Sequence, residues 1–204
     1  MRKARKPLCL LLCAMLLLSM SAAALGANNN YSSWFQTNYD EINKLGLMPA
    51  SFNGLDLTKN ITRGEMCELA VYAFEKATGN DIDMSNETFT GFTDTSDENI
   101  VKAHLYGIVN GYGSGLFGPN DPVTREQLAA ILYRYAVYGG MTAVTLEENL
   151  GSFADTAQLS AYAIQAMNWA VGQGLINGSG SNLVPKAQAT RAQVAAIIHR
   201  YLER

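Results

Sequence analysis

Three segments of the chain place apolar side chains at the spacing of one face of an α-helix. Counted from Thr62, Thr124 and Thr190, apolar residues stand 4, 7, 8 and 11 positions further on in each segment. This spacing predicts three amphipathic helices, because residues three and four apart lie on the same helical face. The apolar positions are Met66, Leu69, Ala70 and Ala73 in the first segment, Leu128, Ile131, Leu132 and Tyr135 in the second, and Val194, Ile197, Ile198 and Tyr201 in the third.

The start of each helix is also predicted. Each of the three threonines is followed three residues later by Glu or Gln. In this capping-box pattern the Thr hydroxyl accepts from the third helical amide, and the Glu or Gln side chain bonds back to the amide of the cap. We therefore predict that the helices begin directly after Thr62, Thr124 and Thr190. The partners in the three boxes are Glu65, Gln127 and Gln193.

An arginine follows each capping threonine, at Arg63, Arg125 and Arg191. A cation in the first turn faces the positive end of the helix dipole, which is unfavourable by roughly 0.3 kcal/mol or more. Each arginine could pair with a neighbouring carboxylate or cover apolar surface with its stem. Alternatively, guanidinium and helix N-terminus could together hold an anionic group. The residues alone leave both interpretations open.

A second helix is predicted upstream of each capped one, separated from it by a loop rich in Gly, Asn and Pro. In the first and third segments it carries an aromatic residue, Trp34 or Tyr162, 12 positions before the glycine that ends the helix. In the middle segment the helix is shorter, at about 99–106, and lacks that aromatic. Asp94 and Asp155 precede this upstream helix in the second and third segments, and each is a candidate cap for it.

The unit is thus helix, turn-rich loop and capped helix, repeated at 31–79, 90–138 and 151–204. The fold class predicted is all-α, with each repeat burying its apolar face against its neighbours. Residues 1–27 have a basic start, an apolar run and a small-residue end, which predicts a cleaved signal peptide, with an uncleaved anchor as the alternative. No other stretch is long and apolar enough to span a membrane.

The net charge of the chain and its few Cys and His residues exclude several classes of function. Removing the four basic residues of the signal from 15 leaves 11 Lys and Arg against 18 Asp and Glu, a net charge near −7 that argues against nucleic acid as a partner. Cys67 is then the last thiol and is expected to be a buried small residue. His104 and His199 lack partners at metal-ligand spacing, and no catalytic motif occurs. We predict no enzyme activity, cofactor or metal.

The repeats resemble the S-layer homology family. The second repeat reads "FTD" and then "GIVNGYGSGLFGPNDPVTREQ", the third reads "FAD" and then "GLINGSGSNLVPKAQATRAQ", and the divergent first repeat keeps "ITRGE". The resemblance implies a pseudo-threefold helical unit with grooves between repeats. It also implies a protein of the bacterial cell wall or surface that binds a secondary cell-wall polysaccharide non-covalently, commonly through a pyruvylated sugar.

The same resemblance implies roles for particular residues. Arg63, Arg125 and Arg191 would meet the pyruvate carboxylate, Trp34 and Tyr162 would form groove walls, and Gly111 and Gly178 would let the ligand approach the backbone. The second and third repeats depart from the family by having Gln127 and Gln193 in place of the usual Glu, which removes a negative charge beside each arginine. We expect one or two functional grooves. A protein-interaction or structural envelope module and a peptidoglycan-binding module are the alternatives.

Overall fold

The computed structural model describes residues 30–85, 89, 91–139 and 149–203, and within them the regular secondary structure is helical apart from isolated β-bridges. The predicted signal peptide, residues 1–27, lies outside the described residues. Among the described helices, none combines the length and apolarity needed to cross a bilayer. The predicted all-α fold class is confirmed.

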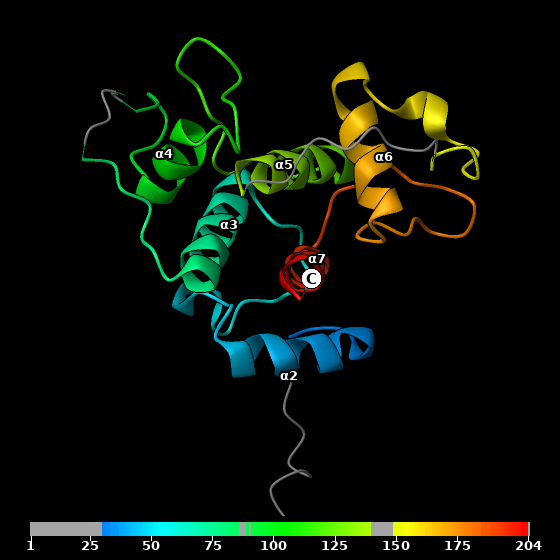
Figure 1. The fold of residues 1–204 in the computed structure, drawn as a ribbon, viewed down its shortest axis with the longest axis horizontal. Helices are drawn as coiled ribbons and strands as arrows, with labels where there is room; N and C mark the ends of the chain where they lie inside the picture. The colour runs from blue at the N-terminus through cyan, green and yellow to red at the C-terminus, as the bar shows by residue number, and fades with distance from the viewer. Residues whose placement is uncertain (1–29, 86–88, 90, 140–148, 204) are drawn as a thin grey trace, which may run out of the picture.

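Each repeat contributes an outer and an inner helix. The first repeat contains the 3-10 helices η1 (Ser33–Phe35) and η2 (Ala50–Phe52), the outer helix α2 (Gln36–Leu45) and the inner helix α3 (Arg63–Thr78). The second contains α4 (Glu98–Leu105) and α5 (Arg125–Tyr138). The third contains η3 (Thr156–Gln158), η4 (Ala161–Ala163), α6 (Ile164–Gly172) and α7 (Arg191–Leu202). Figure 1 shows the outer helices α2, α4 and α6 lying in three directions around α3, α5 and α7.

The predicted capping boxes are present in all three inner helices. Thr62, Thr124 and Thr190 have extended backbone, and each hydroxyl accepts from the amide three residues later. The side chain at that later position accepts in return from the amide of the threonine. Local sequence therefore fixes where the inner helices begin.

A closed ring of three hydrogen bonds joins the residues just before the caps. The Ile61 amide donates to Ala189, the Ala189 amide to Val123, and the Val123 amide to Ile61, at N–O distances of 3.0, 2.8 and 3.1 Å. All three side chains are fully buried. Because equivalent positions bond in a cycle, the three repeats are related by a pseudo-threefold axis through this ring.

The inner helices supply about half of the core residues. Their capped starts bring the apolar faces together around the axis, and the predicted positions in those faces are buried, with Tyr201 partly so. Cys67 is buried as expected, and burial raises the pKa of its thiol to about 12, so that it is protonated and inert at neutral pH.

Candidate ligand-binding grooves

The helix N-termini themselves have no free amides to offer an anion. The amides of Arg63 and Gly64 donate to the carbonyls of Asp121 and Pro119 in the next repeat, both at 2.9 Å. The first two amides of α5 and α7 bond in the same way to the third and first repeats, and the third amide of each helix bonds to its threonine. The interpretation that helix N-terminus and guanidinium act together is therefore wrong, and any anion must be held by side chains and loops.

A first groove lies where the start of α3 meets the second repeat. Its cavity volume is about 250 Å³, slightly below the range of about 300–1,000 Å³ found for pockets of drug-sized ligands. The polar residues that line it are Arg63, Asn110, Tyr112, Gln127, Arg134 and Tyr162, and Gly111 lines it as well. The predicted residues Arg63, Gly111 and Tyr162 thus share one site although they come from three repeats.

Arg63 is held rigidly in this groove. Its Nε donates to the carbonyl of Phe117 at 3.0 Å and its Nη2 to the carbonyl of Asn110 at 2.8 Å. The guanidinium lies between the rings of Tyr112 and Phe117, 4.4 and 4.3 Å from their centroids. Only 6% of the residue is exposed, so Arg63 serves mainly to tie the first repeat to the loop of the second.

Tyr162 forms the outer wall of the first groove and is 53% exposed. Its hydroxyl donates to Glu126 at 3.2 Å, and the same carboxylate accepts from Ser160 and Lys186. Burial and the negative charge of Glu126 raise the pKa of Tyr162 to about 12, so the hydroxyl stays protonated as a donor. Glu126 therefore positions the aromatic wall, a role that the sequence pattern did not reveal.

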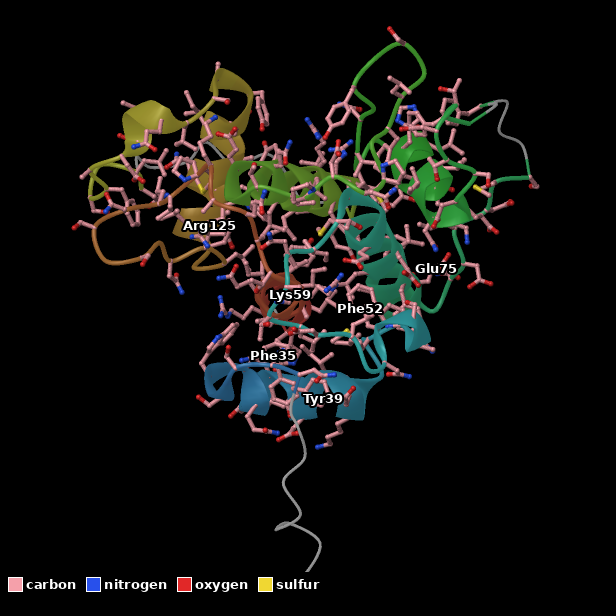
Figure 2. The ribbon with its side chains drawn as sticks, turned by 180° about the vertical axis from the view of Figure 1, so that it is seen from behind. Phe35, Tyr39, Phe52, Lys59, Glu75 and Arg125 are labelled. Carbon is pink, nitrogen blue, oxygen red and sulfur yellow. The ribbon has the colours of Figure 1, made fainter. Side chains whose placement is uncertain are left out.

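A second groove lies where the start of α5 meets the third repeat. It has a volume of about 240 Å³, and its lining includes Arg125, Trp34, Gly178, Gln193 and Arg200. Figure 2 shows Arg125 beside the loop between α6 and α7, where its Nε donates to the carbonyl of Leu183 at 2.8 Å. Trp34, 51% exposed, faces this groove from the first repeat.

Arg125 differs from Arg63 in its surroundings. The positions equivalent to the rings around Arg63 hold Ser179 and Leu183, so no aromatic sandwich forms. Burial lowers the pKa of Arg125. The negative charge of Asp155 acts in the opposite direction, although the two side chains form no ion pair. A permanently charged guanidinium in this setting would be stabilised by a carboxylate ligand.

The third equivalent position is filled by the protein itself. Arg191 donates from Nε and Nη2 to the two carboxylate oxygens of Glu65, at 2.9 and 2.7 Å, and from Nη1 to the carbonyl of Asp56 at 3.0 Å. Arg191 was predicted to bind the ligand, but its fork already holds a carboxylate. Glu65 occupies the capping-box position at which the two grooves have Gln127 and Gln193.

Both grooves also contain a second arginine that the sequence analysis missed. Arg134 and Arg200 come nine residues after Arg125 and Arg191, and Arg134 lines the first groove while Arg200 lines the second. Nine residues are two and a half turns, which places the two arginines on opposite sides of one helix. The first repeat has Tyr72 at this position. Aligning the three repeats would therefore have revealed an arginine shared by the second and third repeats alone.

Gly111 lines the first groove and Gly178 the second, and the fold itself requires both glycines. A Cβ at Gly111 would come within 2.6 Å of the Phe92 ring, and one at Gly178 within 2.6 Å of the Phe153 ring. Each would also lie 2.7 Å from a carbonyl oxygen of the same loop. The glycines therefore let a phenylalanine pack beneath the loop, and access for a ligand is a second consequence.

Asp94 and Asp155 brace the loops and do not cap the following helices as expected. Asp94 accepts from the amides of Phe117 and Gly118, and Asp155 accepts from the amides of Leu183 and Val184, all within 3.2 Å. The cap of α4 is Asp97.

The first repeat has a cavity of about 290 Å³ near Tyr31 and Tyr39, but no charged side chain lines it.

Comparison with known sequences decides the family. The profile described as "S-layer homology domain" matches residues 98–129 and 152–195, which include the starts of α5 and α7. Two segments of this chain are S-layer homology domains. The family is a binding and anchoring module, and it places this protein at the bacterial cell surface or cell wall.

Named relatives agree with this assignment. The chain is 33% identical over 155 residues to an amylopullulanase of Thermoanaerobacterium thermosulfurigenes, covering 72% of this chain and 8% of that protein. It is 33% identical over 156 residues to exoglucanase XynX of Acetivibrio thermocellus, covering 72% and 13%. It is 27% identical over 188 residues to the surface-layer 125 kDa protein of Lysinibacillus sphaericus, covering 90% and 15%. The chain thus spans less than a sixth of the length of these relatives.

Proposed function

We propose that the protein anchors itself at the cell surface by binding an anionic cell-wall polysaccharide non-covalently, through a pyruvylated sugar terminus. The carboxylate meets the guanidinium of Arg125 in the second groove, which Arg200 also lines. Trp34 provides an apolar face for the sugar ring. The first groove, with Arg63, Arg134 and Tyr162, is a second and more rigid site of the same kind.

One observation carries this proposal. Each groove combines an exposed aromatic ring with two arginines, and among the described residues none of these four arginines has an ion-pair partner. Where a carboxylate is available at the same position of the symmetric ring, as Glu65 is, the arginine binds it in a bidentate manner. The pairing of Arg191 with Glu65 is thus an example, within the protein, of the interaction that the arginines of the open grooves would make with a ligand carboxylate.

Residues 31–79 complete the unit as a divergent third S-layer homology repeat in this proposal. The capped helix, the cyclic hydrogen bonds and the packing of α2 against α7 support it. Its own contact with Arg191 is structural, so two grooves serve the ligand. In this reading the chain has no enzymatic activity of its own, and the activities named for its relatives belong to other parts of those proteins.

A protein-interaction or structural envelope module is the second candidate. It is favoured by Arg63 and Arg191, whose side chains tie neighbouring repeats together without any ligand. Retention of Arg125 without a carboxylate partner favours the anionic ligand instead. Peptidoglycan binding would use the same grooves for a different polymer.

Sedimentation with cell walls tests the proposal. Wild-type protein and Arg125→Ala are mixed with native walls, walls stripped of pyruvyl groups, and walls stripped of the polysaccharide. Arg125→Lys is the matched control that keeps the charge but loses the planar fork. We expect wild type to sediment with native walls only, Arg125→Ala to sediment with them much more weakly through the first groove alone, and Arg125→Lys to lie between the two. Equal sedimentation of all variants with all three walls would refute glycan recognition and favour peptidoglycan or a protein partner.

A further inference from the structure

A histidine near the end of the chain has an unusual environment. His199, in the last turn of α7, is 2% exposed, and within the described part of the chain its Nε2 atom is buried without a hydrogen-bond partner. A buried nitrogen left unpaired is unfavourable, because it has lost its hydrogen bond to water without gaining another. The position of Nε2 therefore calls for an explanation that the grooves do not provide.

Two carboxylates face this nitrogen from different elements. Glu203 Oε1 lies 3.4 Å from Nε2 and comes one helical turn after His199, and Glu41 Oε2 lies 3.9 Å from Nε2 and comes from α2. The three ligand atoms lie within 4.8 Å of one another. Both carboxylates are more than half exposed and can move towards the ring. The expectation that His199 lacks a partner at metal-ligand spacing overlooked Glu203 at the fourth position on.

We propose that Glu41, His199 and Glu203 bind a divalent zinc ion. Imidazole and carboxylate ligands coordinate zinc at about 2.0–2.2 Å in tetrahedral geometry, with water able to take the fourth position. Donor atoms in such a site are separated by about 3.3–3.6 Å. The 3.4 Å between Nε2 and Glu203 already fits this spacing, and the exposed Glu41, at 3.9 Å, has to move closer. The mixed nitrogen and oxygen donors disfavour Ca²⁺ and Mg²⁺, which prefer oxygen ligands alone.

The ion would join the first repeat to the last. Glu41 lies on α2, which packs against α7, and these two helices come from opposite ends of the described chain (Figure 1). The metal would therefore close the ring of three repeats where no covalent connection does so. This role is independent of glycan recognition, because none of the three ligands lines either groove.

Zinc binding is measured directly on chelator-treated protein. After incubation with Zn²⁺ and gel filtration, we expect one zinc per chain by elemental analysis. We also expect a rise in Tm of about 5–10 °C at a hundredfold excess over Kd. Cobalt in place of zinc should give a visible d–d absorption band, and Ca²⁺ should give no shift in Tm.

Variants separate the site from adventitious binding. Glu41→Gln with Glu203→Gln removes both carboxylates at exposed positions and should lower zinc affinity by more than about tenfold. Asp40→Asn, the neighbouring carboxylate on α2, is the matched control and should bind zinc like wild type. His199→Gln tests the nitrogen ligand. No retained zinc in wild type, or zinc affinity unchanged in the double variant, would overturn the proposal.

Discussion

The second groove and the contact of Arg191 are two versions of one structural position. In each, an arginine directly after a capping threonine projects into the following repeat around the pseudo-threefold ring. In the groove it faces Gln193, and in the other contact it faces Glu65. The two positions thus differ in whether a carboxylate of the neighbouring capping box pairs with the arginine.

The comparison also shows that the capping role and the electrostatic role of this position are separable. Glu and Gln both accept from the amide of the capping threonine, at 3.0–3.1 Å in the first and third repeats. Helix initiation therefore tolerates either residue. The charge affects only the neighbouring repeat, where it meets the arginine.

The largest effect is expected from Gln193→Glu, which gives the second groove the residue found at the closed position. The new carboxylate should pair with Arg125, keep the capping box intact and exclude an anionic ligand. We expect the affinity for native walls to fall nearly as far as in Arg125→Ala, by about 2–5 kcal/mol at this groove. Sedimentation over a range of wall concentrations measures it.

An isosteric control keeps this experiment interpretable. Gln193→Met has similar length without charge and should bind far better than Gln193→Glu, although its cap is weaker. Circular dichroism should show all variants folded. If Gln193→Glu binds native walls like wild type, the carboxylate does not control access and the comparison between the two positions fails.

Glu65→Gln is the converse change and should act mainly on stability. It breaks the bidentate ion pair with Arg191, whose partners are both largely buried, while keeping the capping box. We expect a loss of about 1–3 kcal/mol, a typical value for leaving a buried partner unsatisfied. Chemical denaturation measures the free energy of unfolding.

Ligand stoichiometry in the same variant sharpens the comparison. The second repeat has Thr95 where the other two have Trp34 and Tyr162, and the first has Tyr72 where the others have an arginine. Freed Arg191 would therefore lack both an aromatic wall and a second cation, and titration with the glycan should still give two sites. A third site would mean that Glu65 alone closes this position.

Trp34→Ala should have a smaller effect, confined to the second groove. The ring is about half exposed and contacts Phe35 edge-on, so its removal leaves the core intact. We expect glycan binding to weaken by about 0.5–1.5 kcal/mol with Tm unchanged, as measured by titration calorimetry and thermal melting. Trp34→Phe should restore most of the affinity. An equal loss in both variants would argue that the indole makes a specific polar contact.

The helices and their starts could be predicted from the sequence because the determinants are local. The apolar spacing and the Thr–x–x–Glu or Gln boxes act within one helix, and all three capped helices begin where predicted. Trp34, Tyr162 and the two glycines line the grooves, and their roles toward a ligand stay predictions.

The contacts between repeats could not be predicted from the sequence, because they depend on which repeats are neighbours in the folded ring. The partner of Arg191 is Glu65, 126 positions away, and only the closed ring brings them together. The same holds for the loop carbonyls that occupy the first helical amides, and for Glu126 beneath Tyr162. Asp94 and Asp155 were mistaken for helix caps because a loop amide and a helix amide have the same local chemistry.

The smallest predicted effect concerns the loops that frame both grooves, and it depends on pH. The amides of Gly118 and Phe117 hold the pKa of Asp94 below its ordinary value. Burial alone would raise the pKa of Asp155, but the amides of Leu183 and Val184 likewise hold it below that value. A carboxyl whose pKa is lower in the folded state stabilises the protein above its unfolded pKa of about 3.9, and this contribution is lost as pH falls through the folded value.

We therefore expect Tm of the wild type to fall on acidification below about pH 4, and Asp155→Asn to have a lower Tm at neutral pH but a shallower acid dependence. Thermal melting from pH 7 to pH 2 measures both, without interference from the titration of a ligand carboxylate. The two aspartates brace equivalent loops of the second and third repeats, so Asp94→Asn should behave in the same way. Parallel acid profiles for wild type and both variants would show that these loop bonds do not contribute to stability, and that the grooves are shaped by the packing of Phe92 and Phe153 alone.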